Sequence, residues 1–450
     1  MTARHSRISD MHTSPPKIIK DSLWLYARMG ILLVLNLWTT RLLIEYMGVD
    51  GYGIWSLILS IVLVWSVLGD IIGDTIVRYV SVALARGRDR KRLDSIFRVF
   101  TRLYLGADLV MVVLASTVGY WWLTSYADIS VSDKAAVTQT FFIVIAMLMI
   151  KALNVPFLSY LVAQEKFRKY VILSLAEGVG TFITALLLPL FPDSEALIGY
   201  GWMLVIAESA ILVTYISSCR KDICTPASYK LDRQDRQLMR ESIKYIAWII
   251  IGASAVMVWI HGLNIAVNRI YGIEATAACA IAMGILVRLR GFCANAQRAV
   301  QPRLMKLYSA GRKPELTSLL RNYLAASILI ISLICVPLCI FAPELLEMWL
   351  GIVPPTTVQL TRVVILSAWV IIFEIPLNAI IHASGNIKKF EIAEGSVLLL
   401  IIPVFCLTAL SGGADLVTSF ASQLAVIAIA LAIRAVIAGR HIKRMTAHRQ

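Results

Sequence analysis

Twelve apolar segments separated by short polar loops constrain the fold of this chain more than any other feature. A helix needs about 20 residues to cross a bilayer core of about 30 Å. Lipid offers the backbone no hydrogen-bond partners, so segments of this length are expected to be helical. The segments are residues 21–47, 53–83, 99–123, 135–162, 170–191, 197–218, 242–271, 274–302, 318–342, 358–384, 390–411 and 414–438. We therefore predict an all-α polytopic membrane protein with twelve transmembrane helices.

The charges in the loops alternate in sign from one loop to the next. One set of loops holds clusters of Lys and Arg, such as residues 86–92 and 166–169, and both termini belong to this set. The opposite loops are acidic, with Lys134 as their one cation. Cationic loops stay on the cytoplasmic side, so both termini are predicted to be cytoplasmic, in a bacterial cytoplasmic (inner) membrane. The net charge of +15 is explained by these loops, and no nucleic-acid partner is expected.

The second half of the chain repeats the first. Gly48-Val49-Asp50 corresponds to Gly272-Ile273-Glu274 at an offset of 224 positions, and Lys20 to Lys244 at the same offset. Six helices is an even number, so the second half enters the membrane from the same side as the first. This predicts two six-helix bundles related by a parallel repeat. The expected boundaries are a tail at 1–20, a bundle at 21–218, a basic linker at 219–241, a second bundle at 242–438 and a tail at 439–450.

Several classes of chemistry are disfavoured by what the sequence lacks. No short apolar core with a cleavage site precedes the first segment, so no removable signal peptide is expected. Most of the seven cysteines fall inside apolar segments, where packing is the expected role rather than a disulfide or a metal site. No Gly-x4-Gly-Lys-Ser/Thr loop for nucleotide binding is present. The acidic loops are short, which leaves no room for a catalytic domain. We expect no cofactor and no enzymatic activity.

Cations inside the apolar segments mark candidate binding sites, because a charge at the helix centre costs at least about 2.5–3.5 kcal/mol. Lys151 lies near the middle of the fourth segment, and Arg288 lies about 20 Å down the eighth. Arg28 is about 9 Å from the edge of the first segment, where snorkelling to the interface is an equal alternative. For Lys151 the alternatives are a functional site and a buried ion pair.

Acidic residues inside the segments are candidates for ion coupling. Glu208 and Glu374 lie near mid-membrane, and each is either a proton-linked carboxylate or the partner of a buried cation. Asp70 lies in the inner third of the second segment. Neutral polar residues form two further stripes at helical spacing: His261, Asn264 and Asn268, and Glu374, Asn378 and His382. Such stripes either join helices or line a hydrated cavity between the two halves.

Short motifs in this chain resemble those of the polysaccharide-transporter family, the lipid-linked oligosaccharide flippases. That family belongs to the multidrug/oligosaccharidyl-lipid/polysaccharide exporter superfamily, which also holds the multidrug and toxic-compound extrusion proteins. The resemblance covers nearly the whole chain. The motifs are Met47-Gly48-Val49-Asp50-Gly51-Tyr52-Gly53-Ile54-Trp55, Leu68-Gly69-Asp70, Arg78-Tyr79-Val80-Ser81, and Gly385-Asn386 with Lys388 and Lys389.

The resemblance implies alternating access by two bundles and export of a polyprenyl-pyrophosphate-linked oligosaccharide for cell-surface polysaccharide (O-antigen, capsule or exopolysaccharide). It implies a cavity lined by the first, second, seventh and eighth helices. Membrane lipids and a glycan polymerase or export complex are the expected partners. The candidate substrate-binding residues are Arg28, Asn36, Lys151, His261, Asn264 and Arg288. The candidate ion-coupling residues, for a proton or sodium gradient, are Asp70, Glu208 and Glu374.

Three alternatives remain open at this point. The first is a cation-coupled multidrug exporter of the same superfamily. Drug-extruding relatives commonly use an acid in the first helix, whereas this chain offers only Glu45 at the outer end of that helix. The second is a membrane glycan polymerase, ligase or glycosyltransferase, and the third is a scaffold that transports nothing.

Overall fold

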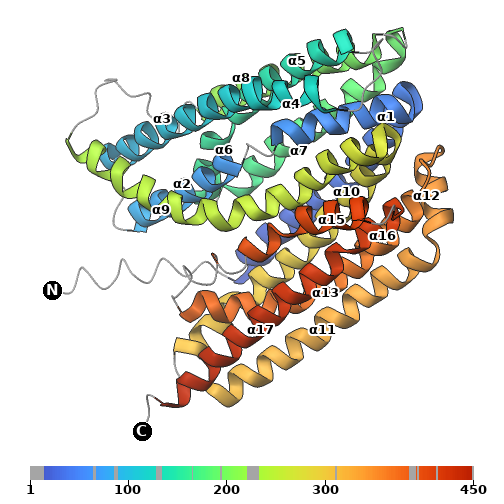
Figure 1. The fold of residues 1–450 in the computed structure, drawn as a ribbon. Coiled ribbons are helices and arrows are strands. Elements are labelled where there is room, and N and C mark those ends of the chain that lie inside the picture. Colours follow the sequence, from blue (N-terminus) through green and yellow to red (C-terminus); the bar gives the residue numbers. More distant parts are fainter. Residues whose placement is uncertain are drawn as a thin grey trace.

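A computed structural model of the chain describes residues 15–63, 67–85, 90–127, 134–164, 166–192, 195–219, 233–309, 312–384, 392, 395–411 and 414–447. Within these ranges the molecule is all-helical and contains no strand. The helices run side by side along one long direction (Figure 1). The all-α, two-bundle fold expected from the sequence is confirmed.

The described part of the first half forms ten helical elements. These are α1 (Pro15–Leu63), α2 (Val67–Ala85), α3 (Arg90–Leu114), the π-helix η2 (Ala115–Gly119), α4 (Tyr120–Ser125), α5 (Lys134–Ala152), α6 (Val155–Ala163), α7 (Phe167–Leu186), the 3-10 helix η3 (Leu188–Leu190) and α8 (Ala196–Cys219).

The second half follows a similar plan. It comprises α9 (Arg233–Met257), the π-helix η4 (Val258–Gly262), α10 (Leu263–Ser309), α11 (Lys313–Ile340), α12 (Ala342–Leu350), α13 (Thr357–Ser384), α15 (Ile401–Ser411), α16 (Leu416–Ala421) and α17 (Gln423–Ala447). The start of α9 packs on α2 and α3 of the first half, where Asp235 pairs with Arg98 at 3.2 Å.

Two long helices, α1 and α10, each contain a break at a glycine. Gly48 has φ 72° and ψ 176°, and Gly272 has φ 86° and ψ −174°. This region of backbone space is essentially closed to residues with a Cβ atom. Each glycine therefore ends one membrane crossing and begins the next. The two breaks are the positions that the sequence repeat pairs at an offset of 224, so the repeat corresponds to a shared structural feature.

Length and apolarity support a membrane-spanning fold. Among the described residues, eight helices are long and apolar enough to cross a membrane, and residues 357–371 and 395–411 form shorter apolar helices. Two of the eight, Ala27–Leu63 and Ser254–Gly291, contain the glycine breaks. Dividing them at Gly48 and Gly272, and continuing the second crossing through α2, accounts for twelve crossings.

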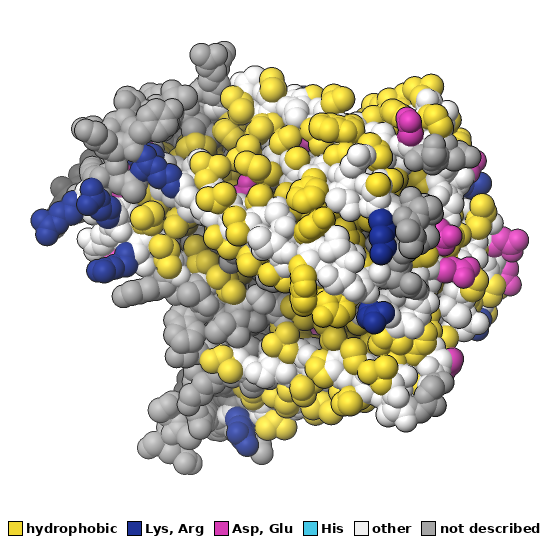
Figure 2. Space-filling view, turned by 45° about the horizontal axis from the view of Figure 1, so that its top comes forward, with side chains coloured by type: hydrophobic (Ala, Val, Ile, Leu, Met, Phe, Trp, Pro, Cys, Tyr) yellow, Lys and Arg dark blue, Asp and Glu magenta, His cyan; other side chains and the backbone are white. Residues whose placement is uncertain are grey.

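The surface of the molecule has the charge distribution of a membrane protein. Hydrophobic side chains cover the middle, Lys and Arg gather toward one end, and Asp and Glu gather at the other (Figure 2). Large apolar side chains such as Leu329 and Leu333 are more than two-thirds exposed, at 71% and 76%. Exposed apolar area on this scale requires lipid around it. The chain is therefore a multi-pass integral membrane protein.

The two bundles meet near the glycine breaks. A Cβ atom added at Gly53 would lie 2.6 Å from the backbone oxygen of Ile273, so only a glycine permits this close approach. Nearby, the Asn264 amide donates a hydrogen bond to Ser60 Oγ at 2.9 Å, across the bundle interface. On the same side, Trp349 of α12 donates a hydrogen bond to the Leu37 carbonyl at 2.8 Å. The bundles are thus in direct contact at the acidic end of the molecule.

Candidate functional site

A central cavity of about 490 Å³ lies between the two bundles. Both arms of α1, the π-helix η4 and α10 form its walls, which are the first, second, seventh and eighth membrane crossings. Its polar lining residues are Asn36, Tyr52, Ser56, Ser60, His261, Asn264 and Arg288. Leu59, Leu63, Ile260, Met283 and Val287 add apolar surface. The cavity therefore combines hydrogen-bonding groups with an apolar wall.

Arg288 is the one formal charge among the residues that line the central cavity. No Asp or Glu is among these residues. Within the described part of the chain, no carboxylate forms an ion pair with Arg288, and its electrostatic neighbour is the phenol of Tyr52. An unpaired guanidinium in a cavity of low polarity favours an anion, because planar N–H donors match carboxylate and phosphate oxygens.

A second cavity of about 410 Å³ lies inside the first bundle, among α1, α5, α6, α7 and α8. Its charged lining residues are Arg28, Lys151 and Glu177. Asn36 lines this cavity as well as the central one, so the two spaces are neighbours that share one amide side chain. We call this second space the N-bundle cavity.

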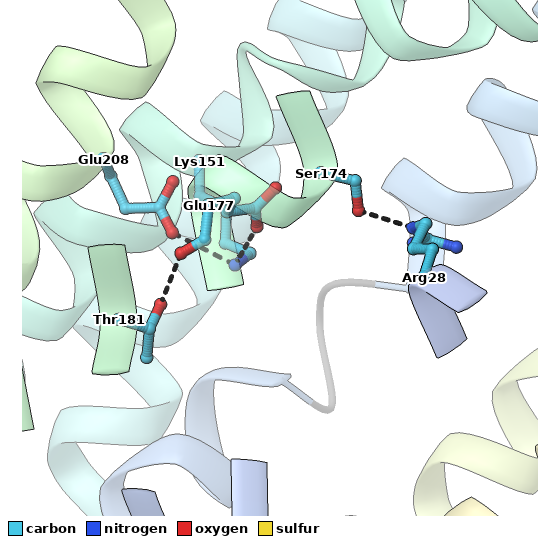
Figure 3. A network of polar contacts seen from close by, with 6 residues as sticks. All are labelled: Arg28, Lys151, Ser174, Glu177, Thr181 and Glu208. Carbon is cyan, nitrogen blue, oxygen red and sulfur yellow. Dashed lines mark hydrogen bonds and ion pairs between the residues drawn. The ribbon is translucent and has the colours of Figure 1, made fainter. Parts of the chain in front are cut away.

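Ion pairs in the N-bundle cavity centre on Lys151. Its ammonium lies 2.5 Å from Glu177 Oε1 and 3.1 Å from Glu208 Oε1, so that one cation sits between two carboxylates (Figure 3). Arg28 lies to one side, where its Nε donates a hydrogen bond to Ser174 Oγ at 2.7 Å and its guanidinium lies over the Tyr170 ring at 4.7 Å. Two cations and two acids leave the group neutral when all four are ionised.

A corresponding ion pair lies in the second bundle. Glu374 of α13 meets Arg434 of α17 at 2.5 Å, and both side chains are about 5% exposed. Glu208 and Glu374 are therefore both partners of buried cations in this structure, which is one of the two alternatives that the sequence left open. Their role in ion coupling stays a prediction.

The structure brings the predicted substrate-binding residues together. His261, Asn264 and Arg288 line the central cavity, Arg28 and Lys151 line the N-bundle cavity, and Asn36 lines both. Asp70 lies in α2, but its side chain falls outside the part that the structure describes, as do the side chains of Asn378 and His382.

Sequence reasoning missed three charged residues inside the membrane crossings: Glu177, Arg434 and Asp108. Glu177 and Arg434 complete the two ion-pair groups. Asp108 is 5% exposed, and neither of its carboxylate oxygens has a hydrogen-bond partner. Each of the three lies within an apolar segment, so the criterion that selected Lys151 would have selected them too. No metal-binding group of His, Cys, Asp and Glu occurs among the described residues.

Solved structures with the same fold place the chain among membrane transporters by architecture. No family model and no curated protein sequence matches it. An inward-facing multidrug resistance MATE family transporter of the MOP superfamily matches with a TM-score of 0.75 and 11% identity, over 95% of this chain and 99% of the other. The MATE multidrug transporter DinF-BH, solved as a complex with a small molecule, matches with a TM-score of 0.70 and 13% identity, over 95% and 96%.

A third structure is informative because of its pocket. A MOP superfamily transporter from Pyrococcus furiosus Vc1 (DSM3638) matches with a TM-score of 0.67 and 12% identity, over 95% of this chain and 96% of the other. It is described as having a binding pocket of reverse polarity that suggests a different function. At these identities the similarity establishes the fold. The chain is a multi-pass membrane protein with the fold of MATE transporters of the MOP superfamily.

Proposed function

We propose that this chain is a flippase that moves a polyprenyl-pyrophosphate-linked oligosaccharide from the inner to the outer leaflet, for synthesis of a cell-surface polysaccharide. It works by alternating access, and its two bundles open the central cavity first to one side and then to the other. Both termini lie on the cytoplasmic side of a bacterial inner membrane. The fold and the charge distribution of the loops support this orientation.

The observation that carries the proposal is Arg288 in the central cavity. It lines a space without any lining carboxylate, and no described carboxylate pairs with it. Moving a pyrophosphate through a region of low dielectric requires a cation for it to bind. A hydrogen bond to a charged group contributes about 1.5–3 kcal/mol. The same arrangement disfavours a cationic drug, which an unpaired guanidinium would repel.

The neutral polar residues of the central cavity suit a sugar. Asn36, His261 and Asn264 can both donate hydrogen bonds to hydroxyl groups and accept hydrogen bonds from them. Asn264 already bonds to Ser60 across the bundle interface, so a glycan that competes for this amide would act on the contact between the bundles. The apolar wall of Leu59, Leu63 and Val287 offers a surface for the lipid chain.

Cation-coupled drug export is the second candidate, and one observation favours it. Two of the structures with this fold are described as multidrug transporters, and one of these is a complex with a small molecule. Export of a cationic drug by this chain would need an acidic cavity. The N-bundle cavity offers Glu177, but Lys151 already occupies that carboxylate.

The test uses a strain that lacks this chain, complemented by the wild type or by Arg288→Ala at matched membrane levels. We expect Arg288→Ala to reduce the flipping rate about ten- to hundredfold, because a charged hydrogen bond of about 1.5–3 kcal/mol is lost. The readouts are surface polysaccharide and polyprenyl-linked oligosaccharide retained on the inner leaflet. Arg269→Ala is the matched control: Arg269 lies on the same helix but is exposed and lines neither cavity.

The outcome that contradicts the proposal is normal surface glycan in the deletion strain. If that strain instead became sensitive to cationic drugs, drug export would replace flipping as the better function. Collapse of the proton and sodium gradients tests the coupling separately. Flipping that continued unchanged would exclude Glu208 and Glu374 from an ion-coupling role.

A further inference from the structure

Comparison of the two bundles separates a structural ion pair from a functional one. Lys151 and Glu374 are 223 positions apart, and Glu208 and Arg434 are 226 apart, close to the repeat offset of 224. In each bundle, the fourth and the sixth membrane crossings are therefore joined by one ion pair at corresponding positions. The charges are reversed between the bundles. The feature common to both is a neutral link between two helices, which is a structural role.

Glu177 has no such counterpart. The position 224 residues later is Ile401, which is apolar and fully buried. The pair in the second bundle is sealed, whereas the Lys151 side chain is 44% exposed and that of Glu177 is 23% exposed. The first bundle thus carries one carboxylate more than the shared link requires, and this carboxylate lies at the wall of a cavity.

The N-bundle cavity also holds polar groups that lack partners. Asn154 is 4% exposed, and neither atom of its amide forms a hydrogen bond. The hydroxyl of Tyr215, which is fully buried, has no partner either. Both residues line the cavity beside Arg28 and Lys151. Leaving buried polar groups unpaired costs about 1–3 kcal/mol each, so the arrangement suits a ligand that accepts hydrogen bonds.

We propose that the N-bundle cavity is a proton-controlled binding site for an oxyanion, a carboxylate or a phosphate-like group, with Glu177 as the group that controls it. When Glu177 is ionised, it holds the Lys151 ammonium and the site is closed to anions. When Glu177 takes up one proton, Lys151 keeps its charge and loses one of its two carboxylate partners. The anion then takes the place of that carboxylate, and Arg28, Tyr215 and Asn154 donate hydrogen bonds to it. One proton and one anion are bound together.

The charged and titratable groups around Glu177 are all accounted for in this scheme. Arg28 faces it from α1, Lys151 from α5, and Glu208 and Tyr215 from α8, while Tyr170 lies on α7 itself. Tyr160 is the titratable residue of α6, and its ring packs on Phe97 instead, at 6.0 Å. Since Glu208 remains paired with Lys151, protonation of Glu177 leaves the site with one net positive charge.

Binding of labelled sulfate to the purified full-length protein in detergent tests the proposal. Sulfate is a suitable probe because its charge stays constant over the range used. Between about pH 6 and about pH 8, the affinity of the wild type is expected to fall as pH rises, by about tenfold per pH unit where Glu177 is ionised. A pH indicator should record one proton taken up per sulfate in that range. Glucuronate in place of sulfate distinguishes an acidic sugar from a free inorganic anion as the better ligand.

Three substitutions complete the test. Glu177→Gln should bind sulfate at every pH as tightly as the wild type does at the acidic end, with no proton uptake. Tyr215→Phe should weaken binding and keep its pH dependence, and it serves if Glu177→Gln fails to fold. Arg288→Gln should change neither affinity nor proton uptake, because Arg288 lines the other cavity. This control separates the site from the proposed flipping function.

Two results would overturn the proposal. One is sulfate binding by Glu177→Gln that keeps the pH dependence of the wild type. The other is loss of sulfate binding in Arg288→Gln, which would place the anion in the central cavity. Neither result depends on whether the central cavity carries a lipid-linked glycan.

Discussion

The buried pair of Glu374 and Arg434 gives the sharpest prediction about stability. Its nitrogen and oxygen lie 2.5 Å apart, and both side chains are about 5% exposed. Arg290 is a third member of the group, since it acts electrostatically on Glu374 and its guanidinium lies over the Trp259 ring at 5.2 Å. Two cations therefore share one carboxylate, and removal of that carboxylate leaves two positive charges together.

Removing one partner of a buried ion pair typically costs about 3–5 kcal/mol, because the remaining charge is left without compensation. We expect Glu374→Gln to fall in that range. Arg434→Met should cost less, because Arg290 remains beside Glu374. The double variant Glu374→Leu with Arg434→Met should recover most of the loss, because an apolar pair of similar volume avoids the cost of desolvating two charges.

The assay is equilibrium unfolding of the purified protein in mixed micelles, followed by the fluorescence of its tryptophans. The two single variants and the double variant form a double-mutant cycle with the wild type, which isolates the coupling between the two residues. A loss below about 1 kcal/mol for Glu374→Gln would refute the reasoning, because such a small cost belongs to exposed pairs. A double variant as unstable as the sum of the single variants would refute it equally.

The glycines at the bundle contact yield two more predictions. Gly48→Ala should destabilise the protein by about 1–3 kcal/mol in the same unfolding assay, because alanine is strained at its backbone angles. Gly30→Ala in the same helix, where an added Cβ meets nothing within 4 Å, should be neutral or stabilising by up to about 1 kcal/mol. Gly53→Ala should weaken the contact with Ile273 and increase maleimide labelling of a cysteine introduced at Ser60. Unchanged labelling would show that this contact does not hold the bundles together.

The regular parts of the fold could be predicted from the sequence because they depend on local patterns. Crossing length and apolarity set the helices, and the charges of the loops set their direction. The breaks at Gly48 and Gly272 were marked by a repeated Gly-x-acid motif that only a turn requires. The place of the central cavity followed from the resemblance, which assigned it to the first, second, seventh and eighth crossings.

Pairing between charges could not be predicted in the same way, because the partners are far apart in the sequence. Lys151 meets Glu208 across 57 positions, and Glu374 meets Arg434 across 60. Depth in the membrane marked Lys151, Glu208 and Glu374 as costly residues but left their partners open. Rotation of one helix by a quarter turn would have changed every partner without changing the pattern of apolar residues.

Reversal of the charges between the bundles explains why depth alone was a poor guide to function. If a cation in the fourth crossing were needed for its own sake, its counterpart in the tenth would be a cation too, and it is Glu374. The repeat therefore requires a neutral pair at this level but not a particular sign. What differs between the bundles is the additional carboxylate Glu177 with the cavity beside it, and the unpaired Arg288 between them. The features that the repeat does not explain are the ones that point to a ligand.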